Sequence, residues 1–83
     1  MTREDIRAAV LAELAEIAPD AAETELCGDA DLRETLDLDS MDMLNLMTTL
    51  HERLGIAIPD RDQRHFTTLD GAVAYLADRL AAS

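Results

Sequence analysis

The sequence has no lysine and no tryptophan, and it contains one phenylalanine and one tyrosine. Because 48% of the chain is nevertheless hydrophobic, its core must consist mainly of aliphatic side chains and methionine, which favours helices packed on helices. The single cysteine, Cys27, excludes a disulfide within the chain. We find neither a secretory signal nor an apolar stretch long enough to span a membrane. We therefore expect a cytoplasmic protein that does not insert into membranes.

Positive charge is also scarce, since seven arginines face 18 acidic residues and the formal net charge is -11. Such a surface repels nucleic-acid phosphates and anionic membranes, so we expect neither as a partner. Basic protein surfaces are its natural complement. The acids are concentrated in residues 21–40, whose net charge is -6, whereas residues 61–83 sum to zero. The acidic segment ends at Ser40, which directs attention to that residue.

At 83 residues the chain has room for one domain, and we expect residues 1–83 to form it as a monomer. Thr2 and Asp5 have the spacing of a helix-capping box. The apolar residues that follow predict a first helix, ended by Pro19, whose stripe comprises Ile6, Val10, Leu14 and Ile17. Residues 18–39 lack a sustained period and predict a long loop, held to the core by Leu26, Leu32 and Leu36.

A second helix is predicted from Ser40 to Gly55, with the serine as N-cap and the glycine as C-cap. Five apolar side chains form its core face: Met43, Leu46, Met47, Leu50 and Leu54. Residues 60–65 predict a short turn of helix after Pro59. Thr68 should cap a last helix, whose apolar stripe comprises Leu69, Ala72, Val73, Leu76 and Leu80. The fold class expected on these grounds is all-α.

The side of the second helix that carries Ser40 is a candidate surface for protein docking. At 100° per residue, Met41 and Leu44 fall on this side and outside the core face. Two exposed apolar residues beside a helix start, edged by polar groups, suit the centre of an interface, and acids around them suit a basic partner. The candidate docking residues are Asp37, Met41, Asp42, Leu44, Asn45 and Thr48.

Ser40 is a poor candidate for a catalytic nucleophile. Such a serine needs a base within hydrogen-bond reach, whereas His51 lies eleven residues away, about 16 Å along the helix at 1.5 Å per residue. No Gly-x-Ser-x-Gly segment is present. A calcium-binding loop starting at Asp29 fails, because Arg33 and Glu34 stand where an acid and a glycine are required. We therefore expect neither catalysis nor a metal site, and on these grounds alone Ser40 is an ordinary helix cap.

Residues 36–42 read Leu-Asp-Leu-Asp-Ser-Met-Asp. This stretch resembles the phosphopantetheine attachment motif of acyl carrier proteins, Asp-Leu-Gly-x-Asp-Ser-Leu. The similarity continues without a gap through Ile56–Asp60, Phe66–Thr68 and Ala72–Leu76. The resemblance implies a four-helix bundle with a long first loop and a short third helix.

The resemblance also implies a function as a carrier and not as an enzyme. A separate phosphopantetheinyl transferase, aided by magnesium, would attach 4′-phosphopantetheine to Ser40, directly after the motif acid Asp39. Acyl groups would then be held on the terminal thiol of this arm as thioesters. The partners implied are the transferase and acyl-loading, condensing or acyl-transferring enzymes with basic docking patches.

The sequence departs from the family pattern in ways that leave the pathway open. Asp37 stands where the motif has glycine. The second helix is nearly neutral, because positions that hold acids in fatty-acid carriers hold Asn45, His51 and Arg53. Fatty-acid, specialised lipid and polyketide synthesis are all compatible with this pattern. A D-alanyl, other aminoacyl or peptidyl carrier is the nearest alternative, and a helical adaptor without a prosthetic group is the remote one.

Overall fold

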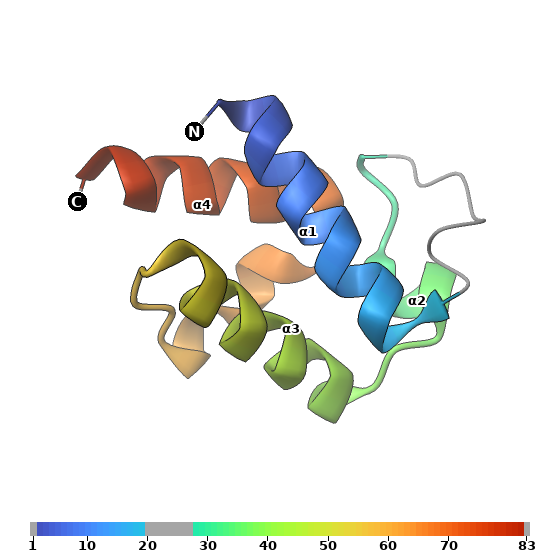
Figure 1. Cartoon of the computed structure of the whole chain (residues 1–83). Coiled ribbons are helices and arrows are strands. Elements are labelled where there is room, and N and C mark those ends of the chain that lie inside the picture. The colour runs from blue at the N-terminus through green and yellow to red at the C-terminus, as the bar shows by residue number, and fades with distance from the viewer. Residues whose placement is uncertain (1, 20–27, 83) are drawn as a thin grey trace.

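The computed structural model describes residues 2–19 and 28–82, and helices are the regular elements of these ranges. They are α1 (Arg3–Ile17), α2 (Leu32–Leu36), α3 (Ser40–Leu54), the 3-10 helix η2 (Asp60–Phe66) and α4 (Leu69–Ala82) (Figure 1). The all-α class is thereby confirmed, and the described ranges contain four main helices together with the short 3-10 helix η2. The expected short third helix is η2, which begins directly after Pro59.

The first helix matches its prediction at both ends. The Thr2 hydroxyl accepts a hydrogen bond from the Asp5 backbone N–H, and the Asp5 carboxylate accepts one from the Thr2 N–H, so the capping box is present. The helix ends at Ile17, two residues before Pro19. Its predicted stripe faces the core, where Ile6, Val10 and Leu14 are fully buried and Ile17 is partly buried.

The long loop predicted over residues 18–39 contains a short helix, α2, which the sequence did not predict. The Asp31 carboxylate caps α2 by accepting hydrogen bonds from the Arg33 and Glu34 N–H groups. Leu32 is fully buried, and its N–H donates to the Thr67 carbonyl at 2.8 Å. Leu32 and the partly buried Leu36 hold the segment to the core as predicted, whereas Leu26 lies outside the described residues.

Helices α3 and α4 follow the predicted apolar stripes. Gly55 ends α3 with φ at 68°, a left-handed conformation that glycine adopts without strain. The Thr68 hydroxyl accepts a hydrogen bond from the Gly71 N–H at 3.0 Å, which confirms the predicted cap of α4. Leu54 and Leu80 pack partly buried against the core. The buried stripe residues are Met43, Leu46, Met47, Leu50, Leu69, Ala72, Val73 and Leu76.

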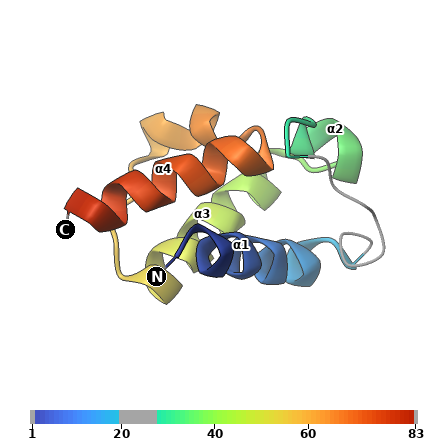
Figure 2. The same cartoon turned by 90° about the horizontal axis from the view of Figure 1, so that it is seen from above.

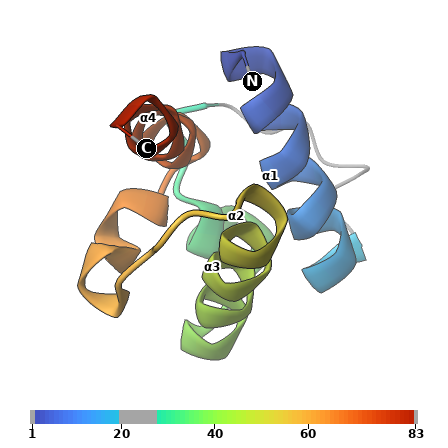
Figure 3. The same cartoon turned by 60° about the vertical axis from the view of Figure 1, so that its left-hand side comes forward.

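The three long helices enclose one apolar core. Helix α1 packs against both α3 and α4, while η2 packs between α3 and α4 on another side (Figure 2, Figure 3). Phe66, at the end of η2, is the largest fully buried side chain of the described residues. This packing leaves the start of α3 and one long side of that helix open to solvent.

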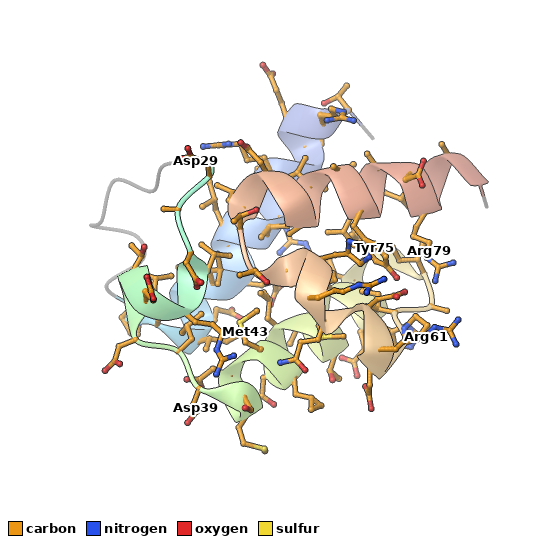
Figure 4. All side chains as sticks on the ribbon, turned by 180° about the vertical axis from the view of Figure 1, so that it is seen from behind. Asp29, Asp39, Met43, Arg61, Tyr75 and Arg79 are labelled. Atoms are coloured by element: carbon orange, nitrogen blue, oxygen red, sulfur yellow. The ribbon has the colours of Figure 1, made fainter. Side chains whose placement is uncertain are left out.

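A group of polar side chains fastens η2 to α4. The Tyr75 hydroxyl donates a hydrogen bond to the Asp62 carboxylate, and the Arg79 guanidinium donates to both, at 3.1 Å to the hydroxyl and 3.3 Å to the carboxylate (Figure 4). His65 stacks on the Tyr75 ring, with centroids 5.0 Å apart. The hydrogen bond from Tyr75 is the main cause that lowers the pKa of Asp62, and burial is the main cause that raises the pKa of Tyr75.

The Asp62 carboxylate should therefore make stability depend on pH. A group whose pKa is lowered by folding contributes stability above its unfolded pKa and loses it as pH falls through the folded value. We expect Asp62→Asn to have a lower Tm than wild type at neutral pH, and this gap to close as pH falls below about 4. Thermal unfolding at a series of pH values measures the gap.

Asp60→Asn is the control, because the Asp60 side chain is exposed and makes no hydrogen bond within the described residues. Its Tm should stay close to that of wild type throughout. If the Tm difference between wild type and Asp62→Asn were the same at about pH 2 as at neutral pH, the negative charge of Asp62 would not be the source of its stabilising effect.

Candidate functional site

The start of α3 is organised by Asp39, and the prediction that Ser40 is the N-cap is wrong. Asp39 has an extended backbone, and its carboxylate accepts a hydrogen bond from the Asp42 N–H at 2.9 Å. The Asp42 carboxylate accepts one from the Asp39 N–H at 3.2 Å, which completes a capping box. Ser40 is thus the first residue inside the helix. It does not need to use its hydroxyl as a cap, because Asp39 already supplies one.

The Ser40 side chain is exposed, and its hydroxyl forms no hydrogen bond with the part of the chain that the structure describes. The backbone N–H groups of Ser40 and Met41 also have no acceptor among those residues. Unpaired N–H groups at a helix start, with the positive end of the helix dipole, stabilise a phosphate group. The residues present therefore fit a phosphodiester on the Ser40 hydroxyl.

Asp37 sets the direction in which the chain enters this site. It ends α2 with φ at 54°, and it is the non-glycine residue with positive φ within the described ranges. Aspartate is one of the few residue types that tolerate this conformation, which explains how it replaces the glycine of the family motif. The turn buries Leu38 in the core, and Asp39 and Ser40 follow at the surface.

The structure places the predicted docking residues together around this point. Met41 and Leu44 are 66% and 37% exposed and are the exposed large hydrophobic residues of the described part of the chain. Asn45 and Thr48 are exposed on the same helix, and the Thr48 hydroxyl donates to the Leu44 carbonyl at 2.9 Å. The predicted separation of this surface from the core face of α3 is therefore confirmed.

A groove that the sequence did not predict runs along α3 beside these residues. Its volume is about 330 Å³. One wall comes from α3 and the other from the segment that leads into η2, so helical spacing alone reveals only the first wall. The His51 ring nitrogen Nδ1 contacts the Ile56 carbonyl at 2.5 Å, which fixes the ring where the two walls meet. The lining residues are Leu44, Met47, Thr48, His51, Ala57, Ile58, Pro59 and Asp60.

Arg53 has a role within the fold that its spacing did not reveal. Its guanidinium donates a hydrogen bond to the Glu13 carboxylate of α1 at 3.0 Å, and the Glu13 side chain is only 11% exposed. The arginine thus offsets a nearly buried acid and ties the end of α3 to α1. It adds little to the charge that a partner would meet on α3.

Other site types receive no support from the residues that the structure describes. Among residues 2–19 and 28–82, no cluster of three or more histidine, cysteine or acidic side chains is arranged to hold a metal ion. Within the same ranges no helix is both long and apolar enough to cross a membrane.

Comparisons with known proteins identify the family of this chain. The family model described as a phosphopantetheine attachment site matches residues 6–76. An acyl carrier protein of Rubrobacter xylanophilus is 35% identical, over 99% of this chain and 100% of its own length. An acyl carrier protein of Renibacterium salmoninarum is 34% identical, over 87% of this chain and 93% of its own. The chain belongs to the acyl carrier protein family, whose phosphopantetheine-bearing members are carriers and not enzymes.

Proposed function

We propose that residues 1–83 form a single carrier domain in which the Ser40 hydroxyl bears 4′-phosphopantetheine, and that acyl groups are held on this arm as thioesters. The observation that carries the proposal is the exposed Ser40 hydroxyl at the first position of α3. Neither this hydroxyl nor the adjacent backbone N–H groups of Ser40 and Met41 have a hydrogen-bond partner within residues 2–19 and 28–82. Family membership supplies the kind of group that would be attached there.

The chain's own contribution to the attachment is limited to a few groups. Ser40 supplies the oxygen that forms the new bond to phosphorus, while the pyrophosphate bond of coenzyme A breaks and its nucleotide part leaves. The proton of the hydroxyl passes to a base on the transferase. The helix start then stabilises the negative charge of the attached phosphodiester. A carrier of this kind depends on the transferase for the base and for magnesium.

Intact-mass measurement tests the attachment. After incubation with coenzyme A, magnesium and a broad-specificity phosphopantetheinyl transferase, the chain should gain the mass of one phosphopantetheine. The sequence has two serines, Ser40 and Ser83, and trypsin separates them because arginines lie at positions 33, 53 and 79. The added mass should appear on peptide 34–53. An unmodified chain, or modification of the C-terminal peptide, would refute the proposal.

Partner enzymes should bind the surface around the attachment point. Met41 and Leu44 provide an apolar centre for the contact, and Asn45 and Thr48 form part of its polar rim. The carboxylates of Asp37 and Asp42 suit basic side chains on the enzyme. Acyl-loading, condensing and acyl-transferring enzymes with basic patches are the partners we propose, together with the transferase. The residues proposed for this surface are Asp37, Met41, Asp42, Leu44, Asn45 and Thr48.

We expect Leu44→Ala to impair loading without unfolding the chain. An exposed residue that is truncated changes stability by about 0.5 kcal/mol or less, whereas loss of an interface anchor often costs more than about 1 kcal/mol of binding. The kcat/KM of acyl loading should therefore fall about fivefold or more. Leu46→Ala is the matched control, because it makes the same change on the fully buried side of α3.

Leu46→Ala should lower the free energy of unfolding by about 2–5 kcal/mol. If Leu44→Ala were equally destabilised and loaded at a normal rate, Leu44 would belong to the core and not to the docking surface. Thermal melting and single-turnover loading of both variants, each carrying the prosthetic group, give the comparison.

The cargo is decided by which enzyme loads the modified chain. We propose an acyl group for fatty-acid, specialised lipid or polyketide synthesis. The test offers the holo protein to acyl-transferring enzymes, ATP-dependent acyl ligases and amino-acid-adenylating enzymes from the source organism, and measures thioester formation by intact mass. Loading by an amino-acid-adenylating enzyme alone would replace the acyl proposal with an aminoacyl carrier.

A further inference from the structure

The short helix η2 carries two exposed arginines in a chain that is acidic overall. This helix has the sequence Asp-Arg-Asp-Gln-Arg-His-Phe from Asp60 to Phe66. Its inner acid, Asp62, is only 16% exposed at its side chain and is bound by Tyr75 and by Arg79 of α4. The positive charges of Arg61 and Arg79 both act on the Asp62 carboxylate, so Asp62 offers little charge to an incoming partner.

The two arginines of η2, Arg61 and Arg64, point to solvent. Both are exposed, and neither forms a salt bridge with another described residue. The labelled Arg61 extends outward from η2, whereas Asp39 lies at the far end of α3 (Figure 4). With Asp62 offset, exposed Asp60 is the opposing charge on η2. A chain of net charge -11 thus presents a small positive edge at this point.

This edge belongs to an ordered element beside the groove. Phe66 is fully buried, and the hydrogen bonds of Asp62 to Tyr75 and Arg79 hold the middle of η2. Asp60, the first residue of η2, lines the groove together with Leu44 and Thr48 of α3. Arg61 follows Asp60 directly in the chain, so an enzyme that reaches Ser40 and covers the groove on the Leu44 side of α3 meets the start of η2.

We propose that the arginine edge of η2, formed by Arg61 and Arg64, is a second docking contact that binds acidic side chains on an acyl-loading enzyme. This inference rests on the proposed function. The occupant is an enzyme surface of mixed charge, basic opposite the acids around Ser40 and acidic opposite η2. Such a pattern fixes the direction in which the enzyme lies along α3, because the reversed orientation would place like charges together.

The alternative is an enzyme whose basic patch extends over η2 as well. Arg61 and Arg64 would then repel it, and their removal would speed association. The sign of the effect on rate therefore separates the two arrangements. Exposed charges act mainly on encounter, and salt screens them over about 10 Å at 0.1 M, so the effect should be largest at low ionic strength.

The experiment uses full-length holo protein and the enzyme that gives the highest kcat/KM with wild type in the loading panel above. Arg61→Gln, Arg64→Gln and the double variant are compared with Ala12→Glu. Ala12 is exposed on α1, and its substitution makes the net charge one unit more negative, as each single arginine substitution does. Each variant is first modified by the broad-specificity transferase and checked by intact mass.

We expect each single arginine variant to lower kcat/KM about threefold at low salt and the double variant about tenfold, with most of the loss removed at about 0.5 M salt. Ala12→Glu should remain within about twofold of wild type. A double variant within twofold of wild type, a faster double variant, or an equal loss for Ala12→Glu would each overturn the proposal. Failure of wild type itself to be modified or loaded would instead refute the carrier function.

Discussion

A Ser40→Ala chain is expected to gain no mass in the transferase reaction and to hold no acyl group, while its Tm stays close to that of wild type. The hydroxyl is the proposed attachment point, so its removal should abolish modification completely. The structure also predicts that the fold tolerates the change, because Asp39 and not Ser40 caps α3. An exposed substitution of this kind changes stability by about 0.5 kcal/mol or less.

Asp39→Ala is the matched comparison and should show the opposite pattern. Loss of an N-cap side chain costs about 1 kcal/mol, which lowers Tm by roughly 4–8 °C in a domain of this size. The Ser40 hydroxyl remains, so modification should still occur. Intact mass and thermal melting of the two variants give the test. If Ser40→Ala were the less stable of the two, the serine would be the working cap and the assignment of the helix start would be wrong.

The residues at this helix start show what sequence can predict and where it stops. The core face of α3 and the glycine at its end follow from helical spacing and from the conformational freedom of Gly55, and both are confirmed. Asp39 and Ser40 are both good N-cap types, and the choice between them depends on one backbone conformation. The spacing of Asp39 and Asp42 was the available signal, since two residues three apart can form a reciprocal box.

Helical spacing in the sequence could not predict the short helix α2, the groove or the ion pair between Arg53 and Glu13. Helix α2 spans five residues, too few for a period, and it depends on the Asp31 cap and on the burial of Leu32 against other segments. The groove needs walls from two segments, α3 and residues 57–60. The pair between Arg53 and Glu13 joins residues forty positions apart. Each of these depends on tertiary contacts that local spacing does not encode.

The second large effect is expected at Phe66, whose replacement by alanine should lower the free energy of unfolding by about 3–5 kcal/mol. Its side chain is fully buried and packs edge-on against the Tyr75 ring, with centroids 5.4 Å apart. Domains are stable by only about 5–15 kcal/mol, so the variant should melt at least 12 °C or so below wild type. Urea unfolding followed by circular dichroism measures the loss.

Phe66→Leu is the control, because it keeps an apolar side chain in the cavity and should retain most of the stability. Tyr75→Phe provides a second comparison, since it removes the hydrogen bond to Asp62 and leaves the aromatic packing, at a cost of about 1 kcal/mol. A Phe66→Ala chain that melted within a few degrees of wild type would show that η2 contributes little to the core.

The ranking of these variants bears on the docking surface as well as on stability. Phe66 and the Asp62–Tyr75–Arg79 group hold η2 from two directions, one apolar and one polar. If η2 presents Arg61 and Arg64 to an enzyme from a fixed position, loosening either attachment should weaken loading even at temperatures where the chain remains folded. Tyr75→Phe leaves the charges of η2 intact but removes one of the hydrogen bonds that hold η2 in place. We therefore expect this variant to lower the kcat/KM of loading and to weaken the dependence of kcat/KM on salt.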